Sequence, residues 1–258
     1  MAKAAKKMKG VERTFCRLCG REGELVDSHI YPHWFIKDHL QPENGVPFVI
    51  SSTPGSFPKR APKGFSEDLL CSDCDNRVIG SLETKASEVY RSMKAWFSET
   101  TFIPNWEFRV PLRRGEDVFL FSLSLVFRAM VSANSFFRLL KDCPNCHEVA
   151  SKIGTEILER NFNRQMLMVF RRDMTDVQVV ISPECVVQGE SVGCLIRFGH
   201  WNIFVHLCGP VFPGWALAAY SDAKHWSMYS HESRQDLEIA REIAMTNPHL
   251  VPRIRRGK

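Results

Sequence analysis

"CRLCGREGELVDSHI" at residues 16–30 and "CSDCDNRVIG" at residues 71–80 decide how the first third of this chain folds. Each stretch holds one Cys-x-x-Cys pair, and 51 residues separate the two pairs. Four thiolates from two such turns can surround one zinc ion, which prefers tetrahedral sulfur coordination. We therefore predict a structural zinc site that supplies much of the folding free energy of a small module. Its ligands are Cys16, Cys19, Cys71 and Cys74.

The composition is that of a folded, soluble protein of 258 residues, with 44% hydrophobic and 24% charged side chains. The charge is unevenly placed. Residues 1–14 and 251–258 together hold nine of the 34 Lys and Arg and one of the 29 acidic residues, so the segment between them is slightly acidic. Basic ends attract phosphate backbones through counterion release, although solvated tails also occur on proteins that bind no nucleic acid. We expect DNA as a partner and leave the oligomeric state open.

No apolar run follows the first lysines, so the sequence predicts no secretory signal and a cytoplasmic protein. The most apolar stretch, "VFLFSLSLVFRAMV" at 118–131, is too short for a spanning helix, which needs about 20 residues. We read it as a buried helix without membrane contact. Arg128 interrupts it, and because an unpaired buried charge is costly, Arg128 must lie at a polar seam or pair with an acid.

The order of predicted elements is that of an α+β protein, with an N-terminal zinc module followed by a helical and antiparallel-sheet region. We expect a disordered basic arm at 1–12, the module at 13–100, an α+β domain at 101–250 and a basic tail at 251–258. Helices are predicted after Cys74, capped by Asp75 or Asn76, and at 117–140, 144–160 and 233–245. Strands are predicted within 105–117, at 167–171, 177–182, 193–198 and 201–208, and near 215–220; the proline-rich loop 51–68 is predicted to be irregular.

"DSHIYPHW" at 27–34 lies between the two Cys pairs. A strand that ends in a histidine, a second strand, and a helix that begins at the second Cys pair resemble the HNH, or ββα-metal, endonucleases that carry a structural zinc. The resemblance covers about residues 13–97. The motif "SHIYP" at 28–32, with Glu83 downstream in "GSLET", is most similar to that of a branch of prokaryotic and phage HNH-like proteins.

The resemblance implies a metal-dependent endonuclease, a hydrolase that cleaves DNA phosphodiesters. His29 would be the general base, and Asp27 would bind the metal or orient His29. A catalytic Mg²⁺ or Mn²⁺ would stabilise charge on the scissile phosphate. The family's histidine after the second Cys pair is replaced by Asp75, an acceptable oxygen ligand for magnesium. The family's middle asparagine has no match, because Glu67 and Asp68 occupy that segment. The alternative is a noncatalytic zinc module that binds nucleic acid or a protein partner.

Other residues are candidates for contact with nucleic acid. They are His33, Lys59, Arg60 and Lys63. If Pro32 opens a helix, His33 lies in its first turn.

The remaining cysteines give a weaker signal. "CPNCH" at 143–147 has metal-like spacing, but no second pair follows it. We expect Cys185, Cys194 and Cys208 to be isolated, with the last two acting as small hydrophobic residues in strands.

Overall fold

The structure of the protein, a computed structural model, describes residues 14–40, 48–50, 59–60, 65–99, 107–111, 115–162, 164, 166–170, 179–198, 201–210 and 225–229. The predicted arm at 1–12, the tail at 251–258, the strand near 215–220 and the helix at 233–245 lie outside the described residues.

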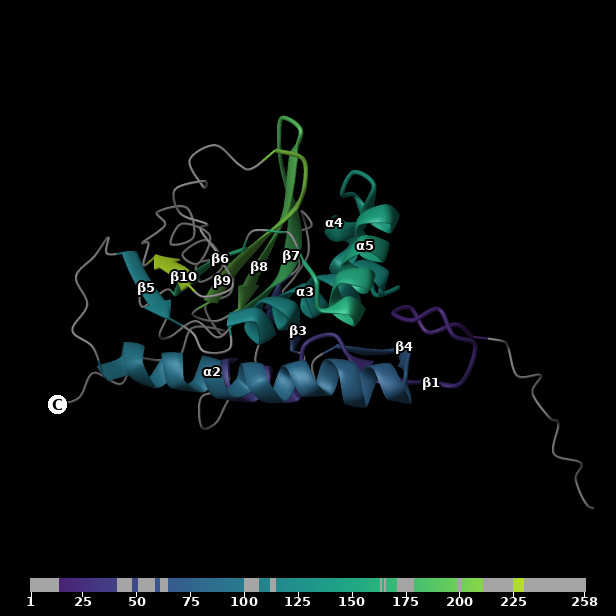
Figure 1. Ribbon diagram of the computed structural model, residues 1–258, viewed down its shortest axis with the longest axis horizontal. Helices are drawn as coiled ribbons and strands as arrows, with labels where there is room; N and C mark the ends of the chain where they lie inside the picture. Colours follow the sequence, from purple (N-terminus) through teal and green to yellow (C-terminus); the bar gives the residue numbers. More distant parts are fainter. Residues whose placement is uncertain are drawn as a thin grey trace, which may run out of the picture.

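Helices and strands are mixed within these ranges, which is the predicted α+β class (Figure 1). The strands are β1 (Leu25–His29), β2 (Phe48–Ile50), β3 (Lys59–Arg60), β4 (Ser66–Cys71), β5 (Glu107–Pro111), β6 (Met166–Phe170), β7 (Val179–Gln188), β8 (Ser191–Phe198), β9 (Trp201–Cys208) and β10 (His225–Tyr229). The helices are α1 (His33–Leu40), the π-helix η1 (Asp73–Ile79), α2 (Gly80–Glu99), α3 (Gly115–Val131), the 3-10 helix η2 (Ser135–Phe137), α4 (Arg138–Lys141) and α5 (Cys146–Glu159).

The described strands form two sheets. β1 and β4 form an antiparallel pair that leads through η1 into α2, the long helix along one side of the molecule in Figure 1. The second sheet has the strand order β3-β2-β7-β8-β9-β6-β10-β5. Helices α3, α4 and α5 lie together beside β7, β8 and β9 (Figure 1).

The large sheet is mixed rather than antiparallel as predicted. β2 pairs with β7 in parallel, and β10 pairs with β6 in parallel. β3 and the start of β4 fall within 51–68, so the prediction of a wholly irregular loop was wrong. Backbone pairing of β3 with β2 and of β4 with β1 overrides a proline-rich local sequence that shows no apolar period.

The helix predicted at 117–140 is interrupted after Val131. The Ser132 hydroxyl accepts a hydrogen bond from the Asn134 amide, and the Asn134 side chain accepts one from the Phe136 amide. Ser and Asn side chains compete in this way with the helical backbone, and Asn134 caps η2. The predicted caps Asp75 and Asn76 are also wrong, because both lie inside η1, which begins at Asp73.

One hydrophobic core joins the predicted module to the helical layer. α3 is buried on almost every side, as expected for an apolar core helix. The rings of Phe35 on α1, Tyr90 on α2 and Phe121 on α3 pack edge to face, with centroids 5.3–5.9 Å apart. In the described residues no single helix is long and apolar enough to cross a membrane. The helical segments Glu116–Val131 and Ser135–Lys141, bent at the break between them, together have the length and composition of a span.

Asp117 of α3 connects α3 to α2 and to the residue that follows α5. Its Oδ1 accepts from Lys85 of α2 at 3.1 Å and from Arg160, just after α5, at 2.6 Å. Burial raises the pKa of the Asp117 carboxyl, but the hydrogen bonds from Arg160 and Lys85 outweigh it, so the pKa is lowered overall. A lowered folded-state pKa means that the pair stabilises the fold above the unfolded pKa, and that this stability is lost as the pH falls through the folded pKa.

We expect Asp117→Asn to lower the free energy of unfolding by about 1–2 kcal/mol at pH 7, because hydrogen bonds to a charged group are lost. The difference from wild type should shrink below a pH of about 4, where the unfolded chain binds the proton. Urea unfolding of both proteins at pH 7 and pH 3 measures this difference in the free energy of unfolding. Glu116→Gln, whose ion pair with Arg160 is far more exposed, is the control and should change stability by less than about 1 kcal/mol. A penalty for Asp117→Asn that is equal at both pH values would contradict the ion-pair assignment.

Candidate metal centre and active site

Four cysteines from two separate turns meet in one cluster. Their sulfur atoms all lie within 4.8 Å of one another, and Cys19 Sγ and Cys71 Sγ are 3.9 Å apart. Zinc–sulfur bonds of about 2.3 Å in a tetrahedron place neighbouring sulfurs about 3.8 Å apart, so the spacing suits one metal ion. The predicted grouping of Cys16, Cys19, Cys71 and Cys74 is confirmed, and these residues can hold a metal ion.

Local backbone structure presents each pair. In the first turn the Gly20 amide donates to the Cys16 carbonyl at 2.9 Å, and Gly20 has a φ of +70°, which favours glycine. The second pair spans the end of β4 and the start of η1. The Arg17 amide donates to the Leu69 carbonyl at 3.0 Å, which fixes the first turn against β4.

A charged clamp holds the two turns together beside the sulfur cluster. Arg21 donates to Cys19 Sγ at 3.4 Å and to Asp73 Oδ2 at 2.9 Å, and Arg77 pairs with Asp73 Oδ1 at 2.8 Å. Burial acts to raise the pKa of Cys19, but the hydrogen bonds from Arg21 and its neighbours lower it to about 6. Burial raises the pKa of Cys74.

His29 is the last residue of β1, opposite Ser66 of β4. It is half-buried and shares one face of β1 with Asp27, while Ser28 between them is buried. Asp27 pairs in register with Asp68, and both are exposed. Because directly opposite residues share a face of an antiparallel pair, two acidic side chains flank His29 on this face.

Glu83 on α2 is within electrostatic reach of His29 at the end of β1. Burial raises the pKa of its carboxyl, Arg128 opposes that shift, and the nearby charges of Asp75 and His29 raise and lower it respectively. The half-buried Asp75 of η1 is therefore within electrostatic reach of Glu83, as is His29. The π-helix that carries Asp75 is a rare conformation that occurs often at functional sites.

Arg128 of α3 connects β1 and α2 from within the core. It is 1% exposed, and its Nη1 donates to Glu83 Oε1 at 2.8 Å and to the His29 carbonyl. Its Nε and Nη2 donate to the carbonyl and hydroxyl of Ser124, one helical turn earlier. Of the two predicted alternatives, a polar seam or an acidic partner, Arg128 has the acidic partner, Glu83. Its second role, fixing the end of β1, had no sequence signal.

The two acids that stand where the family has its asparagine have different surroundings. Glu67 accepts from the Ser132 hydroxyl at 2.5 Å and from the Ala133 amide at 2.8 Å, so it fastens β4 to the end of α3. Asp68 instead faces outward opposite Asp27. Sequence reasoning passed over Asp68 as a site residue.

In the part of the chain that is described, the cysteine cluster is the one place where three or more His, Cys, Asp or Glu ligand atoms gather closely enough for a metal. A cation near His29 and Asp75 would therefore have fewer than three of these protein ligands in this arrangement.

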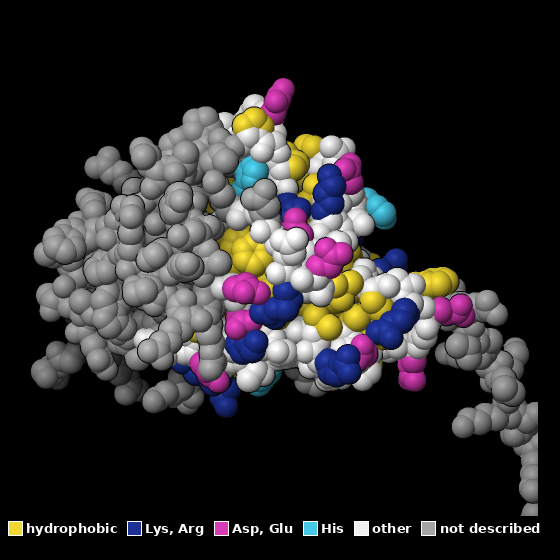
Figure 2. Space-filling view, in the orientation of Figure 1, with side chains coloured by type: hydrophobic (Ala, Val, Ile, Leu, Met, Phe, Trp, Pro, Cys, Tyr) yellow, Lys and Arg dark blue, Asp and Glu magenta, His cyan; other side chains and the backbone are white. Residues whose placement is uncertain are grey.

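Three of the four candidate residues for nucleic-acid contact lie within the described residues. His33 begins α1 and is exposed, as expected from Pro32. Lys59 and Arg60 form β3, and Lys63 lies outside the described residues. On the described part of the face in Figure 2, basic and acidic side chains are interspersed.

Comparison of the chain with protein-family models, with curated proteins and with solved structures finds no match.

Proposed function

We propose that this protein is a metal-dependent endonuclease of the HNH type, or a protein derived from one, that cleaves DNA phosphodiesters. The observation that carries the proposal is the placement of His29 at the end of β1. Its carbonyl accepts a hydrogen bond from Arg128, Asp27 and Asp68 lie on the same face of the strand pair, and Glu83 is within electrostatic reach of His29 and of Asp75. A strand-end histidine next to carboxylates supplies both a proton acceptor and oxygen ligands.

In this mechanism His29 takes the proton of the attacking water. Asp75, with Asp27, would hold Mg²⁺ or Mn²⁺, which would supply positive charge at the scissile phosphate and the leaving oxygen. The cysteine-bound ion is zinc in this proposal. It has no part in the chemistry and fixes the turn that precedes β1, so that His29 is presented by a rigid strand. The basic segments at 1–14 and 251–258 support a polyanionic substrate.

Supercoiled plasmid DNA incubated with the protein and Mg²⁺ or Mn²⁺ is expected to be nicked or linearised. His29→Ala should lower the initial rate about a hundredfold or more, because general base catalysis is lost. His147→Ala, which removes an exposed histidine of α5, is the matched control and should keep the wild-type rate. Cleavage that survives His29→Ala would remove His29 from the mechanism.

The alternative is a noncatalytic zinc module, and the small number of protein ligands near His29 favours it over a preformed catalytic centre. It predicts binding without cleavage. A labelled DNA duplex and an RNA of the same sequence, titrated at several salt concentrations without metal and then with each metal, distinguish the two functions. Salt-dependent binding with no cleavage under either metal would support the module and contradict the endonuclease.

A further inference from the structure

A disulfide ties the helical layer to the large sheet. Cys143, in the turn between α4 and α5, is bonded to Cys185 of β7, with the Cα atoms 5.5 Å apart. The expectation that Cys185 is isolated was wrong. The two cysteines are 42 residues apart, and only the packing of α4 against β7 brings them together.

This disulfide has a free cysteine near each of its halves. Cys146 follows Cys143 by three residues, and its amide donates to the Cys143 carbonyl at 3.1 Å. Cys194 of β8 is the cross-strand partner of Cys185. The Cys194 thiol is completely buried, so an external thiol cannot reach it. Cys146 is half-buried and is therefore the free neighbour that solvent can reach.

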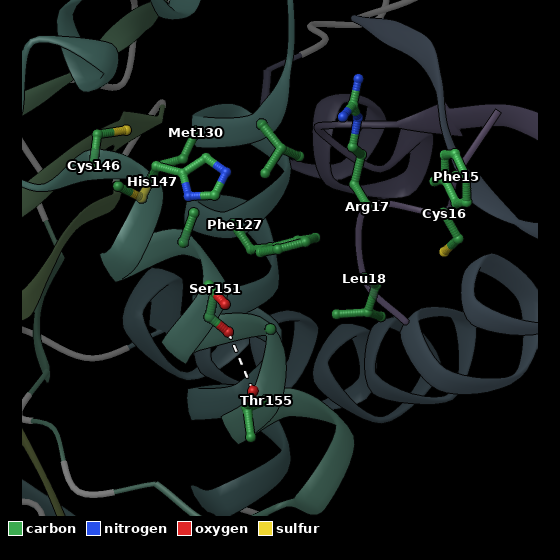
Figure 3. Close-up of a pocket in the computed structure, with 13 residues that line it drawn as sticks. Phe15, Cys16, Arg17, Leu18, Phe127, Met130, Cys146, His147, Ser151 and Thr155 are labelled. Atoms are coloured by element: carbon green, nitrogen blue, oxygen red, sulfur yellow. Dashed lines mark hydrogen bonds between the residues drawn. The ribbon is translucent and has the colours of Figure 1, made fainter. Parts of the chain in front are cut away.

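Cys146 opens onto a cavity of about 560 Å³ between α5, α3 and the first cysteine turn. In Figure 3 Cys146, His147 and Ser151 line one side of it, and Arg17 and Leu18 line the opposite side. A cavity of this size admits a small organic molecule. Cys143 is 5% exposed and does not line the cavity, so a reagent there meets Cys146 first.

We propose that Cys143, Cys146 and Cys185 form a thiol–disulfide exchange site that reacts with low-molecular-weight thiols through this cavity. The Cys146 thiolate attacks Cys143 Sγ; the Cys143–Cys146 bond forms, and Cys185 leaves as a thiolate that takes up the proton lost by Cys146. An external thiolate then attacks Cys146 Sγ and releases Cys143. A second external thiol attacks the mixed disulfide on Cys146, so two electrons pass to the protein and one external disulfide is formed.

The arrangement explains how a bond with one buried partner can still be reduced. Direct attack at Cys143 Sγ needs an approach through the packed layer, and Cys185 is itself half-buried, whereas the Cys-x-x-Cys spacing supplies a thiol of the same chain three residues from Cys143. Exchange also releases β7 from the turn before α5, so the covalent tie between sheet and helices depends on the external thiol. Burial raises the pKa of Cys146, with Lys141 opposing the shift, so most Cys146 is protonated and the exchange is slow.

The test is the rate at which glutathione reduces the Cys143–Cys185 bond in the full chain. Samples are quenched with acid and alkylated, and the pairings are read by peptide mass spectrometry. We expect Cys146→Ser to slow the reduction at least about tenfold, since the internal thiol is gone. Wild type should pass through a trapped Cys143–Cys146 pair and a glutathione adduct on Cys146.

Cys194→Ser is the matched control, because it removes the other free neighbour of the bond, and it should keep the wild-type rate. Far-UV circular dichroism of each oxidised variant checks that the fold is retained, and Cys146→Ala replaces Cys146→Ser if it is not. An unchanged rate in the Cys146 variant, an equal slowing in Cys194→Ser, or free thiols at Cys143 and Cys185 in air-oxidised protein would each overturn the proposal.

Discussion

Cys74→Ser is expected to unfold the first third of the protein while much of the large sheet persists. Cys74 is 1% exposed at the start of η1, and its loss leaves three sulfur ligands where the metal needs four. Structural zinc in small modules contributes about 10–16 kcal/mol of binding free energy at pH 7, so we expect a loss of more than about 4 kcal/mol in the stability of this part. Wild-type protein should hold one zinc ion per chain after dialysis, and the variant less than half of that.

Urea unfolding followed by tryptophan fluorescence and by amide hydrogen exchange measures the effect. Exchange should rise in β1, β4 and η1, where the module is built. Cys208→Ser, in the half-buried end of β9, is the control and should cost less than about 1.5 kcal/mol. Metal-free protein that keeps wild-type exchange protection in η1 would refute the four-cysteine site as a source of stability.

Arg128→Met is expected to lower the free energy of unfolding by about 3–5 kcal/mol, the usual cost of breaking a buried ion pair from one side. Methionine fills similar volume but leaves the Glu83 carboxylate, 22% exposed, without its cation. It also removes the donor to the His29 carbonyl at the end of β1. The same change should lower any DNA cleavage rate through misplacement of His29, which the resemblance makes the general base.

The double variant Glu83→Gln with Arg128→Met separates charge from packing. Because no uncompensated acid remains, it should be more stable than the sum of the two single changes predicts, by about 1–3 kcal/mol. Arg138→Met, on the exposed side of α4, is the control and should change stability by less than about 0.5 kcal/mol. Additive effects of the two single changes would show that Glu83 and Arg128 do not stabilise each other.

Elements whose signal is local were predicted well. β9 matches the predicted strand at both ends, and β8 and β6 match theirs within two residues. β8 and β9 pair from Phe198 and Trp201 inward, as a hairpin requires, with its turn at 199–200 outside the described residues. Alternating apolar residues and a short connection are contained in one stretch of sequence, so no distant partner is needed to recognise them.

Elements that depend on distant partners were missed. The parallel pairing of β2 with β7 joins segments about 130 residues apart in the sequence, and no short-range pattern indicates it. The break after α3 was missed because Glu67 on β4 binds the Ser132 hydroxyl and the Ala133 amide there. A serine and an asparagine inside an otherwise apolar pattern are only weak signs of a helix end.

The sequence by itself determined the metal-binding turns, because two Cys-x-x-Cys spacings and the glycine beside the first of them are local requirements of tetrahedral sulfur coordination. Only the tertiary structure decided which partners the buried reactive groups have. Arg128 meets Glu83 and the carbonyl of His29, and Cys143 meets Cys185, across separations of 42 to 99 residues. Such pairings follow from how helices and strands pack, since burial makes an unpaired charge costly and brings together sulfurs that the sequence keeps apart.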